Sequence, residues 1–248
     1  MLCLCISPYF PHRSPAASNA ERTTMNLELY LVRHGKTVFN TVGRLQGWSD
    51  SPLTPEGREV AERLGAGLRD KVVFDAAFCS VSPRAVDTAR LILNGKGQNG
   101  LPLNVIEEVR EYCFGGFEGE LIQALHEKIA AERGLPDVQT WLEHYRCGQY
   151  NLLAESVSAL DPLGLAETET AFVSRLRRGL DKLLEQSAAG SRVMLVSHGM
   201  SIAGILKSIN PACIPYQSVP NASVSRLRYA EGAWHIDSIG ETHFSSAA

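Results

Sequence analysis

Short hydrophobic runs recur along the first half of the chain, and segments with helical periodicity lie between them. Runs of four to eight apolar residues are typical of strands buried in a parallel sheet, and three such runs lie at residues 29–32, 72–79 and 103–106. Helices are predicted to begin at Thr54-Pro55 and at Pro83, because threonine caps a helix well and proline is tolerated in its first turn. The alternation β-α-β-α-β predicts an α/β fold with a mostly parallel sheet covered by helices.

The second half of the chain adds an insertion and closes the sheet. Residues 117–164 are mainly helical and are interrupted by glycine and proline, and we interpret them as a cap over the sheet. The pattern then predicts a long amphipathic helix, a strongly apolar central strand, a helix and an antiparallel strand pair, at residues 167–186, 192–197, 200–209, 224–229 and 234–239. The predicted architecture is a three-layer α/β/α sandwich with a helical cap insertion.

The first 24 residues differ in texture from the rest. They are rich in proline, serine, alanine and asparagine, which predicts a disordered tail. No basic residue precedes the mildly apolar residues 1–10, and we find no convincing apolar core of a signal peptide, so we expect none. We expect the folded domain to span residues 25–248, and Met25 is a candidate for the natural start.

Composition and charge exclude several classes of function. The 24 Lys and Arg residues nearly balance 27 Asp and Glu residues, which gives no basic surface for nucleic acid or for an anionic membrane. No apolar stretch approaches the roughly 18 residues that span a bilayer. The six cysteines form no Cys-x-x-Cys pair and no zinc-type spacing, so we expect reduced thiols in a cytoplasmic protein without a metal. The sequence leaves open whether the protein is a monomer or a homodimer.

Two predicted strands end in a histidine followed by a glycine, at His34 and at His198. Ligands of open α/β sheets bind at the carboxyl ends of strands, and glycine there lets the backbone approach a ligand closely. Arg33 and Arg84 also follow predicted strands, and arginine keeps its positive charge. A single histidine in this position is more often structural, but the two histidines with two arginines indicate an anion site with a nucleophilic histidine.

Four segments resemble the histidine phosphatase superfamily, in the branch that contains cofactor-dependent phosphoglycerate mutases and many small phosphomonoesterases. These segments are residues 31–40, 46–57, 80–89 and 196–199. Their order and spacing match the family over most of residues 26–229.

The resemblance implies that His34 is the nucleophile and forms a phosphohistidine that water then cleaves. It further implies that Arg33 and Arg84 clamp the phosphoryl oxygens and that His198 donates a hydrogen bond to them. Phosphoryl transfer depends mainly on positioning and fixed positive charge, which two guanidinium groups supply without a metal or another cofactor. Their charges also disfavour a proton on His34, which keeps it nucleophilic.

A leaving alkoxide needs a proton, and residues 109–119 resemble the family segment in which a glutamate lies four residues before a glycine. This alignment selects Glu111, ahead of Gly115, as the general acid. Burial in a cleft would raise its pKa toward a useful value. The alternatives are ordinary solvated or structural carboxylates at Glu107, Glu108 and Glu118.

Further residues are candidates for supporting roles. The resemblance suggests substrate or phosphate contacts at Asn40, Gln46, Gly47 and Asn221, although Asn221 is equally explained as a turn residue. The leaving-group pocket has candidate aromatic walls, each also explained by core packing, at Trp48, Phe117, Trp141 and Tyr145. Cys113 near Glu111 raises the hypothesis of oxidant sensitivity, against the alternative of an inert buried thiol.

The sequence favours a phosphatase over a mutase. Mutases of this family carry a lysine soon after the glutamate segment and later a pair of adjacent arginines. Here Lys128 comes late, and Arg133 and Arg146 are well separated. Glu118 and Glu120 are expected at the rim, where they would repel a substrate carboxylate.

The predicted function is therefore a metal-independent phosphomonoesterase acting on a small phosphorylated metabolite. The alternatives are a phosphoglycerate mutase-type phosphotransferase or a catalytically silent binding domain. The chain departs from the family pattern at Lys36 and at residues 165–168, which could alter substrate choice.

Overall fold

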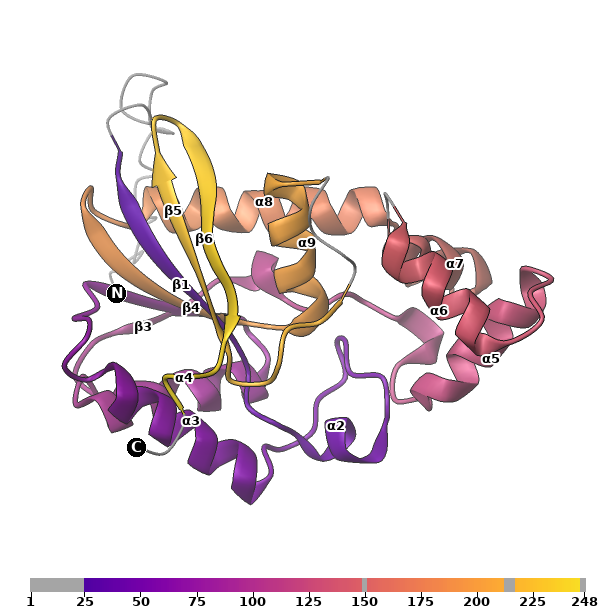
Figure 1. Cartoon of the computed structure of the whole chain (residues 1–248), viewed down its shortest axis with the longest axis horizontal. Helices are drawn as coiled ribbons and strands as arrows, with labels where there is room; N and C mark the ends of the chain where they lie inside the picture. Colours follow the sequence, from indigo (N-terminus) through magenta and orange to yellow (C-terminus); the bar gives the residue numbers. More distant parts are fainter. Residues whose placement is uncertain (1–24, 149–150, 212–216, 246–248) are drawn as a thin grey trace, which may run out of the picture.

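A six-stranded sheet forms the centre of the computed structural model, which describes residues 25–148, 151–211 and 217–245 (Figure 1). The strands are β1 (Leu27–Arg33), β2 (Ala76–Cys79), β3 (Leu103–Val105), β4 (Ser191–Ser197), β5 (Val224–Ala230) and β6 (Ala233–Glu241). Their order is β3-β2-β4-β1-β5-β6, with parallel pairing from β3 to β1 and antiparallel pairing of β1 with β5 and of β5 with β6. The predicted mostly parallel α/β fold is confirmed, and the tail predicted for residues 1–24 lies outside the described residues.

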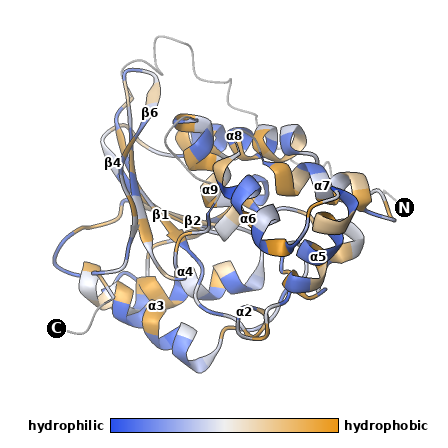
Figure 2. Ribbon diagram, turned by 45° about the vertical axis from the view of Figure 1, so that its right-hand side comes forward, coloured by the Kyte–Doolittle hydropathy of each residue, from blue (hydrophilic) through white to orange (hydrophobic). Residues whose placement is uncertain are grey.

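Helices cover both faces of this sheet. Helices α3 (Pro55–Leu68) and α4 (Pro83–Lys96) pack on one face, and α8 (Glu169–Glu185) and α9 (Gly199–Ile209) on the other (Figure 1). Side chains of β1 alternate between the two cores: Leu29 and Leu31 pack in the cluster of α8 and α9, and Val32 packs with α3 and α4. Figure 2 shows α3 and α8 in mixed orange and blue, as expected of helices with one buried side.

The inserted segment forms a cap of three helices, α5 (Ile122–Glu132), α6 (Val138–Cys147) and α7 (Leu152–Leu160). Figure 1 shows them together at one end of the molecule, beyond the carboxyl ends of β1 and β4. Trp141 of α6 is fully buried and belongs to the same apolar cluster as Phe172 of α8. The cap is therefore packed continuously with the α8–α9 side of the core. Within the described part of the chain, no helix is long and apolar enough to cross a membrane.

Two predicted boundaries are wrong, each for a local reason. The strand predicted over residues 72–79 begins only at Ala76, because the backbone N–H and C=O of Phe74 bond to the side chain of Gln98. The pair Asn94-Gly95 predicts the end of the helix that begins at Pro83, but α4 continues to Lys96 and ends at Gly97, whose φ of 80° suits glycine. A β-carbon at Gly95 would lie 2.3 Å from the carbonyl oxygen of Glu62, so this glycine serves the close packing of α3 on α4.

Candidate active site

The two histidine–glycine pairs meet because β1 and β4 are neighbouring parallel strands. Arg33 is in register with Ser197, and the backbone N–H of His34 donates to the Ser197 carbonyl at 2.9 Å. The imidazole rings of His34 and His198 consequently lie with their centroids 5.3 Å apart. The prediction that both histidines gather at the carboxyl end of the sheet is confirmed.

His34 is held as a neutral imidazole with a defined tautomer. Its side chain is buried, and Nδ1 lies 2.8 Å from the carbonyl oxygen of Gly35. A carbonyl only accepts hydrogen bonds, so Nδ1 carries the proton and Nε2 keeps its lone pair. Burial first, and then the charges of Arg84 and Arg33, hold the pKa of His34 well below its ordinary value. His34 thus has the state that a nitrogen nucleophile requires at neutral pH.

His198 is completely buried beside it. Its Nε2 lies 2.7 Å from the hydroxyl oxygen of Ser80, and its Nδ1 has no hydrogen-bond partner within the described residues. Burial and then the charge of Arg84 also hold the pKa of His198 well below its ordinary value. A buried polar atom without a partner is uncommon in proteins, so the expectation that His198 donates a hydrogen bond to the phosphoryl group stays a prediction.

The two arginines are placed differently. Arg33 lines the cleft, with Nη1 donating to the Val219 carbonyl at 2.6 Å and Nε unpaired among the described residues. Arg84 is buried, and its Nη1 donates to Asp50 at 2.6 Å and to the Ser49 carbonyl at 2.9 Å.

The remaining terminal nitrogen of Arg84, Nη2, donates to the carbonyls of Gln46 at 3.3 Å and Gly47 at 2.8 Å. Both terminal nitrogens of Arg84 thus have partners within the protein, and the expectation that it contacts phosphoryl oxygens stays a prediction. Its guanidinium binds the loop of residues 46–50, and it acts on the site through its charge, which helps to lower the pKa of His34.

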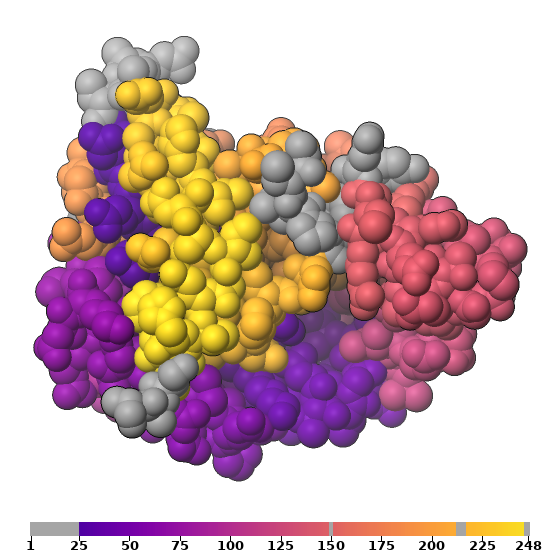
Figure 3. Space-filling view, in the orientation of Figure 1, coloured from indigo at the N-terminus to yellow at the C-terminus, as the bar shows by residue number. Residues whose placement is uncertain are grey.

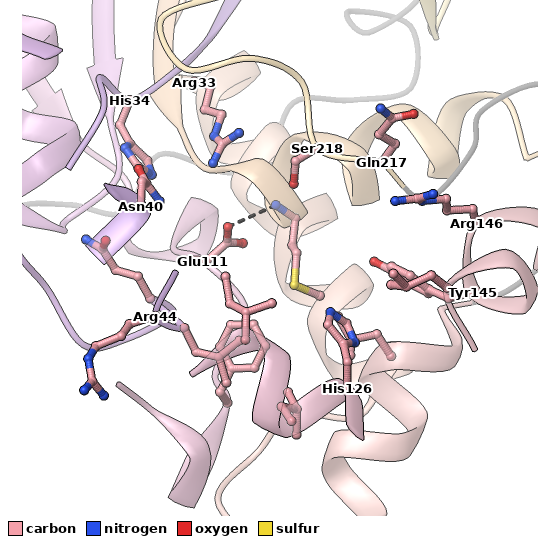
Figure 4. Close-up of a pocket in the computed structure, with 18 residues that line it drawn as sticks. Arg33, His34, Asn40, Arg44, Glu111, His126, Tyr145, Arg146, Gln217 and Ser218 are labelled. Atoms are coloured by element: carbon pink, nitrogen blue, oxygen red, sulfur yellow. Dashed lines mark hydrogen bonds between the residues drawn. The ribbon is translucent and has the colours of Figure 1, made fainter. Parts of the chain in front are cut away.

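Glu111 reaches the same cleft and binds the amino terminus of α9. Its Oε2 accepts from the N–H of Met200 at 3.0 Å (Figure 4). Its Oε1 accepts from the N–H of Ser201 at 2.9 Å and from that of Tyr112 at 2.9 Å. The first amides of a helix lack partners within the helix and favour a negative charge, so they fix the carboxylate in place. Among the glutamates considered, Glu111 is the one that lines the cleft, and its role as general acid stays a prediction.

The alternative glutamates have other surroundings. Glu107 is exposed, and Glu108 pairs with Lys182 of α8. Glu118 accepts hydrogen bonds from the backbone N–H groups of the 47–49 loop and of Phe114, at 2.7–3.1 Å. The expectation that Glu118 and Glu120 form a repulsive rim is wrong for Glu118, because these donors hold its carboxylate, and neither side chain lines the cleft.

Sequence reasoning missed the pair that supports Glu111 from behind. Arg175 of α8 donates to the carbonyls of Glu108 at 2.9 Å, Arg110 at 2.7 Å and Glu111 at 3.1 Å. Its guanidinium also pairs with Glu167 at 2.6 Å, and both side chains are nearly buried. The partners of Arg175 are mainly backbone carbonyls distant in sequence, so no sequence signal indicates this role.

The predicted secondary contacts divide into two groups. Asn40 and Gln46 line the cleft, and their side chains are tied to Thr37. Asn221 donates to the carbonyl oxygen of His34 at 3.0 Å and to Asn40 Oδ1 at 3.3 Å, so it supports the loop that carries the nucleophile. Gly47 donates its N–H to Glu118, and a β-carbon there would lie 2.0 Å from the Tyr112 carbonyl oxygen, so its role is close packing of loops.

The cleft lies between the carboxyl end of the sheet and the cap and has a volume of about 290 Å³. Figure 3 shows the surface hollowed where the cap meets the segment around α2 (Val38–Val42). Of the aromatic residues proposed as walls, Tyr145 lines the cleft. Trp141 and Phe117 are core residues, and Trp48 stacks on Arg110, 4.2 Å from the guanidinium carbon to the ring centroid.

Burial and pairing describe two further residues named in the sequence analysis, Lys36 and Cys113. The ammonium of Lys36 pairs with Glu56 at 3.0 Å on the surface, and Lys36 does not line the cleft. Cys113 is buried, and burial raises the pKa of its thiol. Both properties favour an inert thiol over an oxidant-sensitive one.

Comparisons with known proteins agree with this geometry. The family model of the histidine phosphatase superfamily (branch 1) matches residues 29–242. The 2,3-bisphosphoglycerate-dependent phosphoglycerate mutase 2 of Gloeobacter violaceus is 33% identical over 182 residues, which are 73% of this chain and 75% of the mutase. The corresponding mutase of Bifidobacterium longum is 28% identical over 196 residues, 75% of this chain and 78% of its own.

Solved structures show the same similarity in three dimensions. A phosphoglycerate mutase from Bacillus anthracis superposes with a TM-score of 0.84 at 33% identity, covering 91% of this chain and 97% of the mutase. The α-ribazole phosphatase from Shigella flexneri superposes with a TM-score of 0.65 at 25% identity, covering 87% and 96%. With a family model that spans nearly all of the described residues, the chain belongs to the histidine phosphatase superfamily, in its branch 1.

Proposed function

We propose that the protein is a metal-independent phosphomonoesterase that hydrolyses a small phosphorylated metabolite through a phosphohistidine on His34. The observation that carries this proposal is the state of His34: buried, neutral, with Nδ1 committed to Gly35 and Nε2 left with its lone pair beside Arg33. A neutral imidazole at the floor of a cleft that also holds Glu111 supplies both the nucleophile and the acid of phosphate ester cleavage.

In the first step, Nε2 of His34 attacks phosphorus and the bond from phosphorus to the ester oxygen breaks. Arg33 and the charge of Arg84 stabilise the negative charge on the transferring group. Glu111 gives a proton to the departing alkoxide, so it must be protonated when substrate is bound.

In the second step, water attacks the phosphohistidine and the bond from phosphorus to Nε2 breaks. Glu111, now ionised and held by the amides of Met200 and Ser201, accepts the proton that the water loses. Phosphate leaves, and His34 returns to its neutral form.

The arrangement of cap arginines favours hydrolysis over mutase activity. Arg133 bonds to Ser156 at 2.9 Å and pairs with Glu155, so it faces the cap and not the cleft. Arg146 lines the cleft from the cap side, and Figure 4 shows it across the cleft from His34. In a three-carbon phosphoglycerate the carboxylate lies close to the phosphate. Cations that bind this carboxylate would therefore have to lie close to the phosphoryl site. The phosphatase from Shigella flexneri shows that the fold accommodates hydrolysis.

A mutase-type phosphotransferase is the second candidate. It is favoured by the sequence relatives, since phosphoglycerate mutases are 28–33% identical over about three quarters of this chain. The two candidates share the phosphohistidine and differ in what accepts the phosphoryl group from it.

The test is phosphate release from a panel of small phosphomonoesters in the presence of EDTA, by the wild type and by His34→Ala. We expect release by the wild type and a loss of about four orders of magnitude or more in the variant, as for removal of a nucleophile. The matched control is His144→Ala, an exposed histidine of α6, which should keep full activity.

Release that persists in His34→Ala, or that EDTA abolishes, would contradict the proposal. Absence of hydrolysis together with turnover of 3-phosphoglycerate in the presence of a bisphosphoglycerate primer would establish the mutase. Absence of both activities would indicate a silent binding domain.

A further inference from the structure

The cleft has a phosphoryl end and a cap end. The first holds Arg33, His34 and Asn40, where the phosphoryl group is proposed to bind. The second is formed by the cap side chains His126, Tyr145 and Arg146, which Figure 4 shows across the cleft from His34. The rest of the lining is mixed: it has apolar side chains at Phe114, Leu125, Leu142, Leu153 and Met200, and polar ones that include Glu111, Gln217 and Ser218.

His126 presents a fixed hydrogen-bond donor at the cap end. The indole Nε1–H of Trp141 donates to its Nδ1 at 2.8 Å. Indole nitrogen is a donor only, so Nδ1 must be the unprotonated nitrogen and Nε2 must carry the proton. Burial and then the charge of Arg146 lower the pKa of His126, which keeps this tautomer neutral. The ring therefore offers an N–H group to a ligand in the cleft.

Two neighbours on α6 add to this donor. Burial and the charge of Glu111 raise the pKa of Tyr145, so its hydroxyl keeps its proton. Arg146 lines the cleft and forms no ion pair with any residue in the described part of the chain. A neutral N–H, a phenol and a guanidinium together form a donor-rich, positively charged end that matches a carboxylate.

We propose that this end of the cleft is a second subsite, formed by His126, Tyr145 and Arg146, which binds the terminal carboxylate of the substrate's leaving group. The substrate is then a phosphomonoester whose leaving group carries a carboxylate distal to the phosphate. This inference rests on the proposed function, because the phosphoryl end of the cleft sets the position of the other end. A short leaving group would leave the cap donors unused, and the apolar side chains in the lining favour hydrocarbon in the leaving group, because hydroxyl groups placed against them would lose hydrogen bonds.

Binding of non-hydrolysable phosphonates tests the subsite without requiring turnover. The compounds are straight-chain ω-carboxyalkylphosphonates of three to eight carbons, each compared by calorimetry with its terminal amide, which has a similar shape and no charge. We expect the acid to bind about 10- to 100-fold more tightly than the amide at one preferred length, as for a charged hydrogen bond. Three-carbon compounds should show little preference.

Arg146→Gln should reduce the ratio of acid affinity to amide affinity to near one, because it removes the positive charge that favours the acid. The matched control is Arg133→Gln, which removes another cap arginine that faces Glu155 instead of the cleft, and it should keep the wild-type ratio. Trp141→Phe should lower the ratio of acid affinity to amide affinity by only a few fold. This variant removes the indole N–H that fixes the tautomer of His126, but the imidazole ring of His126 remains.

The result that overturns the proposal is an acid-over-amide ratio near one at every length, or a ratio that Arg146→Gln leaves unchanged. Hydrolysis of simple alkyl phosphates is measured in parallel and separates the two claims. If alkyl phosphates are not hydrolysed but the length-dependent carboxylate preference depends on Arg146, the subsite stands and the proposed function fails. If they are hydrolysed and no preference exists, the proposed function stands and the subsite fails.

Discussion

The two ends of the cleft are built in opposite ways. At the phosphoryl end, His34 is 3% exposed and Arg84 is 1% exposed, and both are tied to backbone carbonyls. At the cap end, Tyr145 is partly buried and Arg146 is exposed, on a helix that packs through Trp141. The positions of the reacting groups are thus fixed by strand ends and loops, which cannot shift without disturbing the core.

The cap residues project from one face of short helices. A substitution at an exposed helical position usually changes stability by less than about 0.5 kcal/mol. Recognition of the leaving group can therefore change while the phosphoryl chemistry is preserved. Members of this family named as mutases and as phosphatases share the fold, in agreement with this division.

The largest effect within this comparison is expected from Glu111→Gln, at the boundary of the two ends. For alkyl phosphates we expect kcat to fall about 10²- to 10⁴-fold, because the poor leaving group loses its proton donor. For an aryl phosphate with an acidic phenol the loss should be much smaller, since that oxyanion leaves without a proton. Steady-state kinetics on both esters measure this, with Glu107→Gln as the exposed control in the same segment. Equal losses on both esters would contradict the role of Glu111 as general acid.

A smaller effect is expected from Arg175→Met, which tests whether positioning extends beyond the residues that face the cleft. Loss of this side chain releases the backbone that carries Glu111 and leaves Glu167 unpaired, so we expect destabilisation by about 2–4 kcal/mol. We also expect kcat to fall by about 10-fold for alkyl phosphates, with less effect on activated aryl esters.

Denaturant unfolding and the same pair of esters measure these changes, and Arg178→Met on the exposed side of α8 serves as the control. Loss of stability with an equal kinetic effect on both esters would mean that Arg175 supports the fold without positioning Glu111.

The smallest effect concerns pH and distinguishes the buried end from the exposed one. The folded-state pKa values of His34 and His198 lie below the unfolded value of about 6.5, so the unfolded chain binds more protons as pH falls below that value. Each histidine therefore contributes stability that is complete above about pH 7 and is lost as pH falls, by about 1 kcal/mol at pH 5.5.

Urea midpoints between pH 7.5 and 5.5 measure this loss, and His34→Asn should reduce its slope, whereas His144→Ala on the cap should not. An unchanged slope in His34→Asn would show that His34 is not held neutral.

The order of elements and the core of the site could be predicted because they depend on local patterns. Each of these features is indicated by neighbouring residues in the sequence: strands by apolar runs, helix starts by caps such as Thr54, and the site by histidines directly after strands. The antiparallel closing pair, β5 with β6, was predicted from its turn and is confirmed.

The rest depends on contacts between residues far apart in sequence. The hydrogen bonds of Arg84 to the 46–50 loop and of Arg175 to residues 108–111 use backbone carbonyls, which every residue has, so side-chain identity gives no signal. The position of Arg146 in the cleft and of Arg133 outside it depends on how α5 and α6 pack, which spacing alone does not determine.

The most direct measurement is detection of the phosphoenzyme. The protein is mixed with a ³²P-labelled alkyl phosphate, quenched within milliseconds to seconds, and digested, and the labelled peptide is sequenced by mass spectrometry. We predict an acid-labile, alkali-stable label on the peptide that contains His34, formed fast enough to account for turnover and absent in His34→Ala. Turnover without a label, or a label on another residue such as His198, would contradict the assignment of His34 as the nucleophile.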